Sequence, residues 1–366
     1  MVTINSSKVL VSVIIPTYNI DLHIQECLKS LEKQTLPKNM FEVIIVDDCS
    51  TDDTLKKARD YKTELKLQVT LLAENLGPGI ARNEGLERAQ GKYILFLDGD
   101  DFLVSDGLER LSGYMRGDEC DLITFNWTYF SDLDDRSALV PRRRDLKDMP
   151  VEREALISHY LGMNMDGSVI YTTAKKSLFE QYAIRFPGGF HEDMSLIFML
   201  YFAAEKILKL DEIIYIKQDL AGSIVNTLSG KHVECYLNAW PIIYQFLTDQ
   251  GVEVTKYMAD YYRGMSGHVC TVISKNLIIN QSDFSSRISI YKFILETLEK
   301  DIRLGRPYSK YFPRVTDKDW VSQLFFAHMS ETKGSLEERA RQFEHEYFNW
   351  RASQGMGSDA KTSVIS

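Results

Sequence analysis

Long apolar runs are absent from this 366-residue sequence. A membrane-spanning helix needs roughly 18 consecutive apolar residues, and the most apolar window here, residues 196–204, is far shorter. The N-terminal residues MVTINSSKVL also lack the charged start, apolar middle and small-residue cleavage site of a secretory leader. We therefore expect a cytoplasmic protein, and the inner face of the cell membrane is the one membrane surface it could contact.

Cysteine is scarce, and the cysteines do not pair in the sequence. The five cysteines are scattered, odd in number and without a CxxC spacing: Cys27, Cys49, Cys120, Cys235 and Cys270. This pattern suggests neither a disulfide framework nor a zinc site. The thiols are expected to be buried or idle.

Positive charge is also in deficit, since the formal net charge is −9. Nucleic-acid binding depends on cationic contacts to phosphates, so no nucleic-acid partner is expected. The single basic run, Arg142–Arg144 with Lys147, follows acidic residues between positions 132 and 135. We interpret it as a solvated loop, with contact to an anionic acceptor or a membrane surface as the alternative.

Strand-like and helix-like segments alternate in the first part of the chain. The expected strands are residues 9–19, 41–48, 67–73 and 92–101, and the expected helices are residues 21–34, 51–61 and 78–89. Strands that are apolar throughout predict a mainly parallel sheet covered by helices on both faces, an α/β fold. Ligands of such sheets bind at the carboxyl ends of the strands, where this sequence gathers polar and turn-forming residues.

The pattern changes along the chain and predicts two domains. Residues 111–228 continue with mixed segments and complete a first domain of residues 1–228, while long helical patterns follow in residues 229–350. Ser335 and Glu338 have the spacing of a capping box that opens a late helix. Residues 351–366 are predicted to be a disordered tail.

Three carboxylates lie within four residues at the end of an expected strand: Asp98, Asp100 and Asp101. A divalent cation would relieve their repulsion, and such hard oxygen ligands suit Mg²⁺ or Mn²⁺. A magnesium-like ion takes only one or two protein carboxylates when substrate phosphates complete its shell. The alternative is an ordinary Asp-Gly turn at a strand end.

Asp47 and Asp48 end another expected strand. A carboxylate at that position can accept a hydrogen bond from a nucleotide base, which we favour for Asp48, whereas helix capping better explains Asp47. Residues 75–83 do not make a dinucleotide fingerprint, because Arg82 occupies its third glycine position. A Rossmann dehydrogenase is therefore disfavoured. The forked guanidinium of Arg82 suits phosphate oxygens, and an ordinary surface arginine is the alternative.

A second acidic motif, His191-Glu192-Asp193, opens an apolar helix-like segment. The helix macrodipole alone favours carboxylates at this position, so helix capping is one explanation. The other is that one carboxylate is a general base, which must reach the proton that it removes. Spacing along the sequence leaves both explanations open.

These segments together resemble a family 2 glycosyltransferase with the nucleotide-diphospho-sugar transferase (GT-A) fold. The matching pieces, in the order found in the family, are VSVIIPTYN, EVIIVDDCSTDDT, ENLGPGIARNEGLERAQGKYILFLDGDD, FHEDM and YIKQDLAGSIVN. They lie between residues 9 and 228, about three fifths of the chain. The resemblance implies that residues 9–110 form the nucleotide-sugar-binding half of the domain and residues 111–228 the acceptor half.

The resemblance implies a site for a nucleotide-sugar donor, with a UDP-sugar as the expected donor. Its implied binding residues are Pro16, Thr17, Tyr18, Asp48, Asn75, Arg82, Asp98, Lys217 and Ser223. Pro16 to Tyr18 would line the nucleoside pocket, Asp48 and Asn75 would approach the base, and Arg82 would lie near the diphosphate. Lys217 and Ser223 would belong to a loop that closes over the diphosphate, although lysine supplies charge without the fork of the arginine that relatives often carry there.

The catalytic parts are implied in the same way. Asp98 and Asp100 match the DxD pair of the family, with Asp100 as the direct ligand of Mn²⁺ or Mg²⁺. Asp193 matches the general base, and Glu192 lies beside it. The implied reaction inverts the anomeric carbon in one displacement and transfers a hexosyl or N-acetylhexosaminyl group to an acceptor hydroxyl.

The implied acceptors are a glycan, a lipid-linked sugar or a polyol phosphate, as in the synthesis of bacterial surface polysaccharide, teichoic acid or glycolipid. Two alternatives are kept: a non-catalytic module that binds nucleotide sugars, and a sugar-phosphate nucleotidylyltransferase. The second would need a glycine-rich loop after the first strand, where this chain has PTYNIDLH. The helical region is rich in Tyr, Phe and Trp, which indicates core packing, with homo-oligomerisation, acceptor binding and membrane-surface docking as alternatives.

Overall fold

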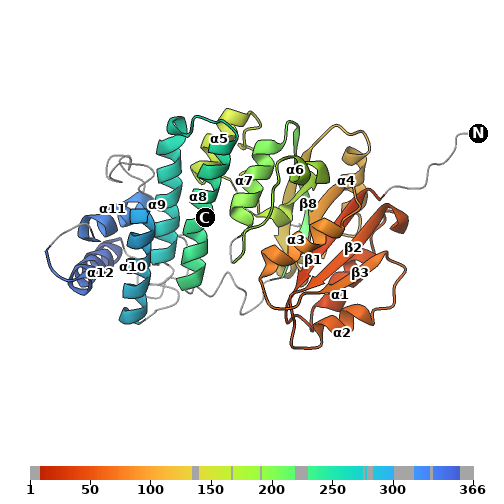
Figure 1. The fold of residues 1–366 in the computed structure, drawn as a ribbon, viewed down its shortest axis with the longest axis horizontal. Coiled ribbons are helices and arrows are strands. Elements are labelled where there is room, and N and C mark those ends of the chain that lie inside the picture. The colour runs from red at the N-terminus through yellow and green to blue at the C-terminus, as the bar shows by residue number, and fades with distance from the viewer. Residues whose placement is uncertain are drawn as a thin grey trace, which may run out of the picture. The chain divides into compact units, whose positions relative to one another are not determined.

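The computed structural model describes residues 9–133, 140–165, 168–189, 192–218, 230–274, 277, 283–300, 317–329 and 333–354. The chain divides into two compact units. The first comprises Met1–Leu156 and Met165–Leu220, and the second comprises Ile157–Asn164 and Ala221–Ser366 (Figure 1). The boundary expected between residues 228 and 229 lies outside the described residues.

The first unit is built on one eight-stranded mixed sheet with the order β3-β2-β1-β4-β7-β6-β8-β5. The strands are β1 (Val11–Thr17), β2 (Phe41–Asp47), β3 (Leu67–Leu71), β4 (Tyr93–Phe96), β5 (Phe102–Leu103), β6 (Leu122–Tyr129), β7 (Thr172–Lys175) and β8 (Ile207–Lys217). Four pairs of neighbouring strands are parallel: β1 with β2, β1 with β4, β2 with β3, and β6 with β8. Three pairs are antiparallel: β4 with β7, β6 with β7, and β5 with β8. The predicted α/β fold with a mainly parallel mixed sheet is confirmed.

Helices cover this sheet because its central strands are apolar on both faces. All seven residues of β1 and of β2 are buried, which is the pattern of parallel strands between two layers of helices. The helices of the first unit are α1 (Ile24–Glu32), α2 (Thr54–Arg59), α3 (Pro78–Arg88), α4 (Gly107–Met115), α6 (Lys176–Gln181) and α7 (Asp193–Ala203), and α5 (Arg153–Leu161) crosses from this unit into the second. Helix α3 can approach β1 closely because Gly85 has no side chain. A Cβ at this position would lie only 2.4 Å from Ile14 Cγ2.

The basic run is not a solvated loop along its whole length. Arg143 is only 5% exposed, and its guanidinium forms an ion pair with Asp145 at 2.6 Å and a hydrogen bond with Thr124. Its backbone is tied to Asn126 of β6 by two hydrogen bonds. The solvated-loop prediction is therefore wrong for Arg143, because an internal carboxylate pairs with it, whereas Arg142 and Arg144 are exposed.

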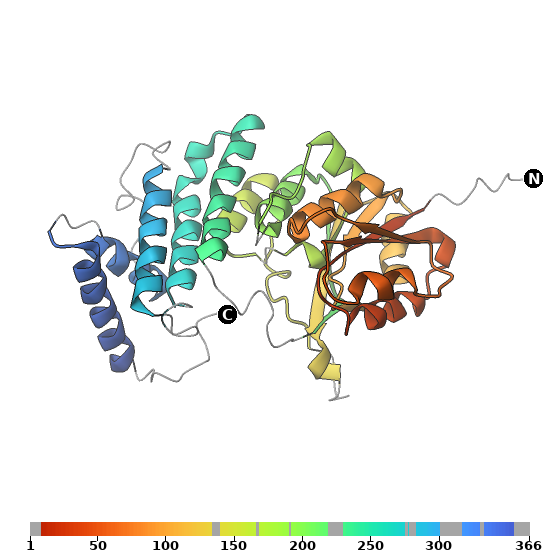
Figure 2. The same ribbon diagram turned by 60° about the horizontal axis from the view of Figure 1, so that its bottom comes forward.

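The second unit is helical, as predicted for the C-terminal region. Its helices are α8 (Gly230–Asp249), α9 (Met258–Ser274), α10 (Phe284–Lys300), α11 (Asp317–Met329) and α12 (Leu336–Ser353), and Figure 2 shows α8, α9 and α10 side by side. Aromatic side chains fill its interior, in keeping with the core-packing interpretation: Trp240, Tyr261, Tyr291, Phe325 and Phe343 are buried.

The C-terminal helix α12 begins at the predicted capping box. The Ser335 hydroxyl accepts from the Glu338 N–H, and the Glu338 carboxylate accepts from the Ser335 N–H. The helix continues to Ser353, so the prediction of disorder from residue 351 is wrong at its start, while residues 355–366 lie outside the described residues. Among the described residues, no helix combines the length and the apolar character needed to span a membrane.

Candidate active site

The acidic turn, residues 98–101, joins β4 to β5 and is held from β8. The Tyr215 hydroxyl accepts from the Asp98 N–H at 3.2 Å and donates to Asp101 Oδ2 at 2.5 Å. The Gln218 N–H donates to Asp101 Oδ1 at 2.7 Å, and the Gln218 amide donates to the Asp100 carbonyl at 2.6 Å. Asp101 is therefore the carboxylate that fixes the turn to the end of β8, because both of its oxygens bind protein groups.

The environment of Asp101 makes its ionisation costly. Burial, followed by the charges of Asp98 and Asp100, raises the pKa of Asp101 to about 8. Burial and the charge of Asp98 also raise the pKa of Asp100 above its ordinary value. A turn that carries three close carboxylates is thus destabilised by their ionisation, and a cation bound there would offset the repulsion.

Asp98 and Asp100 are the carboxylates of the acidic turn that could hold such a cation. Asp98 Oδ1 accepts from Arg82 Nη2 at 2.7 Å, whereas the Asp100 carboxylate, which is partly exposed, accepts a hydrogen bond from its own backbone N–H. Within the described part of the chain, no group of three or more His, Cys, Asp or Glu side chains has the geometry of a complete metal site. Two carboxylates fit an ion whose remaining ligands come from a bound diphosphate and water.

Arg82, on α3, joins the acidic turn to the second acidic motif. It is 6% exposed, and its guanidinium forms ion pairs with both Asp98 and Glu192. The Phe186 ring lies 5.4 Å from the guanidinium carbon. The alternative of a surface arginine is therefore wrong, because two carboxylates 94 residues apart in sequence, numbers 98 and 192, converge on this one buried cation.

Glu192 and Asp193 differ in their surroundings at the start of α7. Glu192 is buried against Arg82, and its side chain makes no capping hydrogen bond to the helix. Asp193 accepts a hydrogen bond from the Ser168 side chain, and burial, followed by the charge of Glu192, raises the pKa of Asp193 to about 6. A carboxyl group with that pKa is ionised at neutral pH and is basic enough to take up a proton.

The carboxyl ends of β1 and β2 meet in a network of hydrogen bonds. Asp48 accepts from the Leu76 and Gly77 N–H groups, both at 2.8 Å, and burial raises its pKa. Asp47 accepts from the Ser50 N–H at 2.8 Å and from the Ser50 hydroxyl at 2.7 Å. Asp48 thus fixes the turn before α3, while Asp47 holds the loop after β2. The prediction that Asp47 caps the following helix is wrong, because α2 begins at Thr54 and its N-cap residue is Asp53.

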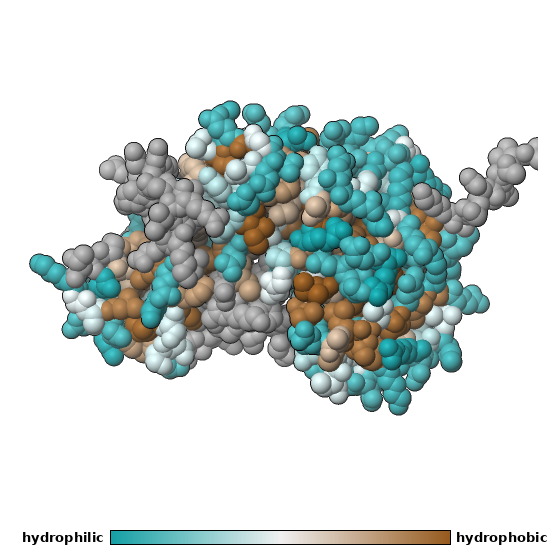
Figure 3. All heavy atoms as spheres, in the orientation of Figure 1, coloured by the Kyte–Doolittle hydropathy of each residue, from teal (hydrophilic) through white to brown (hydrophobic). Residues whose placement is uncertain are grey.

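The remaining expected donor residues lie at the same edge of the sheet or next to it. Pro16 and Thr17 end β1, with the Thr17 hydroxyl bound to Asp47 at 3.0 Å, while Tyr18 is 46% exposed and Asn75 is exposed. Apolar side chains in the loops after β1 and β3 are also exposed, and Figure 3 shows apolar patches over this half of the first unit. Lys217 ends β8; Ser223 and His191 lie outside the described residues.

Comparison with known proteins identifies the family. Residues 12–182 match the family described as Glycosyl transferase family 2. They form a family 2 glycosyltransferase domain. This domain contains α3, the acidic turn and the strands β1 to β4.

Curated relatives share part of this domain with the chain. The poly(ribitol-phosphate) beta-N-acetylglucosaminyltransferase TarS of Staphylococcus aureus is 43% identical over 113 residues, which are 31% of this chain and 20% of the relative. The putative teichuronic acid biosynthesis glycosyltransferase TuaG of Bacillus subtilis is 43% identical over 125 residues, or 34% of this chain and 48% of the relative. The matches thus span between a fifth and a half of these relatives.

A solved structure resembles nearly the whole chain. The crystal structure of S. aureus TarS 1–349 in complex with UDP-GlcNAc has a TM-score of 0.68 and 22% sequence identity, and the match covers 93% of this chain and 92% of that chain. At that identity the likeness establishes the fold. The GT-A fold with a helical C-terminal region is therefore shared, and the glycosyltransferase domain of this chain has the architecture implied by its sequence motifs.

The sequence did not reveal the supporting roles of three residues, Asp101, Ser168 and Tyr215. Asp101 looked like part of a metal cluster, while Tyr215 and Ser168 gave no signal at all. Tyr215 lies within an apolar strand, where its hydroxyl is hidden by the strand pattern. Ser168 precedes a 3-10 helix, Val169–Tyr171, and only the tertiary fold brings it to Asp193.

Proposed function

We propose that this protein is an inverting glycosyltransferase that transfers a sugar from a UDP-sugar to a hydroxyl group of a polyol-phosphate or other surface-polysaccharide acceptor. The observation that carries the proposal is the ion-pair bridge of Arg82, which connects the acidic turn through Asp98 to the motif of Glu192 and Asp193. This bridge supports a single site that combines groups suited to the leaving diphosphate with groups suited to the attacking hydroxyl. The family of residues 12–182 supports the same reaction type.

The proposed base is Asp193. Its raised pKa of about 6 leaves it ionised near neutral pH, so it can take the proton of the acceptor hydroxyl as the oxygen attacks the anomeric carbon. The bond from that carbon to the nucleotide diphosphate breaks in the same step, which inverts the configuration and needs no covalent enzyme intermediate. Glu192 is a positioning residue in this scheme, since its carboxylate is paired with Arg82.

Asp100 and Asp98 would hold a divalent cation, Mn²⁺ or Mg²⁺, together with the diphosphate of the donor. When bound, such an ion neutralises charge that develops on the departing nucleotide diphosphate. Tyr215 and Asp101 keep the turn in place, and Arg82 limits the orientation of Asp98 by occupying its Oδ1. The hard oxygens of two carboxylates suit these ions better than softer metals.

The donor half of the site is proposed to be residues 9–110 and the acceptor half residues 111–228. Asp48, fixed by two backbone N–H groups, would face the nucleoside base, with Pro16 to Tyr18 and Asn75 around it. The exposed ring of Tyr18 offers an apolar face to the base. The name of TarS supports N-acetylglucosamine as the first sugar to test and poly(ribitol phosphate) as the first acceptor, and the name of TuaG supports another anionic polymer, teichuronic acid.

The proposal is tested with the purified full chain and a panel of nucleotide sugars. We expect release of UDP from one UDP-sugar, dependent on Mn²⁺ or Mg²⁺ and accelerated by a ribitol-phosphate oligomer. Asp193→Asn should abolish transfer while donor affinity stays within about twofold. Tight donor binding without any release of nucleotide would instead identify a binding module, and normal turnover by Asp193→Asn would remove the base assignment.

A further inference from the structure

An aromatic row lies at the carboxyl ends of β6 and β8, beside the acidic turn. Trp127 and Tyr129 of β6 are in register with Tyr215 and Lys217 of β8. Residues paired in register point to the same face of a sheet, and side chains two residues apart share a face. These four side chains therefore line one face at the edge where the candidate active site lies.

The Trp127 ring is covered by a tyrosine ring on one face and by a lysine ammonium on the other. Tyr171 stacks on it with centroids 5.1 Å apart and planes inclined by 8°, while Tyr129 packs against it edge-on at 4.9 Å. The Lys217 ammonium lies over the ring, 6.0 Å from its centroid. Since Tyr171 occupies one face, Lys217 lies over the face that remains, and both Trp127 and Lys217 are partly exposed.

The row is connected to both halves of the proposed chemistry. The Tyr171 ring also packs edge-on against Tyr215, at 5.7 Å, and the Tyr215 hydroxyl binds Asp101 of the acidic turn. Tyr171 ends the 3-10 helix that follows Ser168, whose side chain binds Asp193. Tyr171 thus connects the Trp127 ring to the acidic turn and to the segment that contacts the proposed base.

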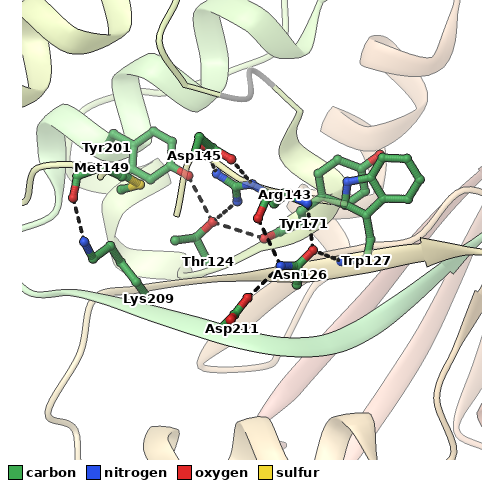
Figure 4. Close-up of polar contacts among 10 residues, drawn as sticks. All are labelled: Thr124, Asn126, Trp127, Arg143, Asp145, Met149, Tyr171, Tyr201, Lys209 and Asp211. Atoms are coloured by element: carbon green, nitrogen blue, oxygen red, sulfur yellow. Dashed lines mark hydrogen bonds and ion pairs between the residues drawn. The ribbon is translucent and has the colours of Figure 1, made fainter. Parts of the chain in front are cut away.

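A buried polar network fixes the strand on which Trp127 stands (Figure 4). Asn126, at an irregularity in the pairing of β6 with β8, donates to Asp211 at 2.9 Å and to the Arg143 carbonyl at 3.1 Å. Its side-chain oxygen accepts from the backbone N–H groups of Trp127 at 3.0 Å and Arg143 at 2.8 Å. These bonds hold the backbone of Trp127 in place. The protein therefore loses less conformational entropy when a ligand binds to the Trp127 ring.

We propose that Trp127 and Lys217 form an acceptor subsite that binds a sugar-alcohol or sugar unit carrying a phosphate. When the unit binds, the Lys217 ammonium moves from over the Trp127 ring to the phosphate, and the C–H groups of the unit pack on the ring face that it uncovers. The proposal rests on the proposed glycosyltransferase function and names the part of the acceptor that this surface recognises. It also gives Lys217 a role toward the acceptor in place of the diphosphate role implied by its sequence segment.

The test measures acceptor binding directly, so that it does not depend on turnover. A ribitol-phosphate oligomer is titrated into the full chain in the presence of UDP, and neutral ribitol serves as the uncharged probe. We expect Trp127→Ala to weaken oligomer binding by about tenfold, and Trp127→Phe to restore most of it, because a phenyl ring still stacks on Tyr171. Lys217→Gln should weaken binding of the oligomer and leave binding of ribitol unchanged.

The matched control is Phe130→Ala. Phe130 follows Tyr129 directly, is 49% exposed and packs against Phe102 at 5.5 Å, outside the row. This variant should bind the oligomer and UDP as the parent does. The subsite is overturned if Trp127→Ala binds the oligomer as well as the parent does, or if the parent does not bind the oligomer. It is also overturned if Trp127→Ala loses as much affinity for UDP as for the oligomer. Failure of the glycosyltransferase proposal is distinguished by oligomer binding without sugar transfer.

Discussion

The Arg82 bridge can be tested as an energetic unit. Arg82→Met removes the cation from between Asp98 and Glu192 and leaves the Glu192 carboxylate, 6% exposed, without a partner. Removing one partner of a buried ion pair costs about 3 to 5 kcal/mol. Because Asp98 is more exposed than Glu192, we expect the lower end, a loss of about 3 kcal/mol in the free energy of unfolding.

A double-mutant cycle separates the bridge from the loss of packing. Glu192→Gln alone still allows Arg82 to pair with Asp98, so it should cost less than Arg82→Met. The double variant should be more stable than the sum of the two single losses predicts, with a coupling free energy of at least about 1 kcal/mol. Urea-induced unfolding measures each variant, and hydrogen exchange of the β1 and β4 amides assigns the transition to the first unit.

The same helix supplies a control for this cycle. Arg88 and Glu84 form an ion pair on α3 whose side chains are 37% and 33% exposed. Exposed pairs of this kind contribute about 0.3 to 0.5 kcal/mol, so Arg88→Met should change stability by no more than that amount. A loss below 1 kcal/mol for Arg82→Met, or a coupling free energy indistinguishable from zero, would refute the bridge as the element that joins the two acidic segments.

Three further predictions concern the base, the acidic turn and the packing of helices. If Asp193 is the base, kcat/KM for transfer should fall as pH decreases through about 6, because protonation of its carboxyl group removes the proton acceptor; a flat profile down to pH 5 would contradict this. Tyr215→Phe leaves buried Asp101 with one hydrogen bond fewer, so stability should drop by about 1 to 3 kcal/mol and the Mn²⁺ concentration for half-maximal activity should rise, both measured on the purified variant. Gly85→Ala should destabilise the protein by about 1 to 3 kcal/mol, because the added Cβ would overlap Ile14 of β1. Gly113→Ala on α4 should stabilise it by up to about 1 kcal/mol, because no atom would lie within 4 Å of the added Cβ. Equal unfolding midpoints for the two variants would be inconsistent with this packing.

The sequence alone determined the class of fold and the positions of the candidate site along the chain. Uniformly apolar strands separated by helical patterns require a covered, mainly parallel sheet, and β1 and β2 are buried at every position. The carboxyl ends of parallel strands share one edge, so the sequence could place Asp48 and the acidic turn on the same side of the sheet. Periodicity and strand ends are local properties, which is why these predictions succeeded.

Only the tertiary structure decided which charged groups meet. The pairing of Arg82 with Glu192, the fastening of Asp101 by Tyr215 and the burial of Arg143 against Asp145 all depend on how loops and helices pack. The same holds for residues 157–164, which join the helical unit although strands of the first unit follow them in sequence. The sequence does not show whether a charged side chain will be solvated or paired with a buried partner. The free energies of the two cases differ because of burial, which only the folded chain determines.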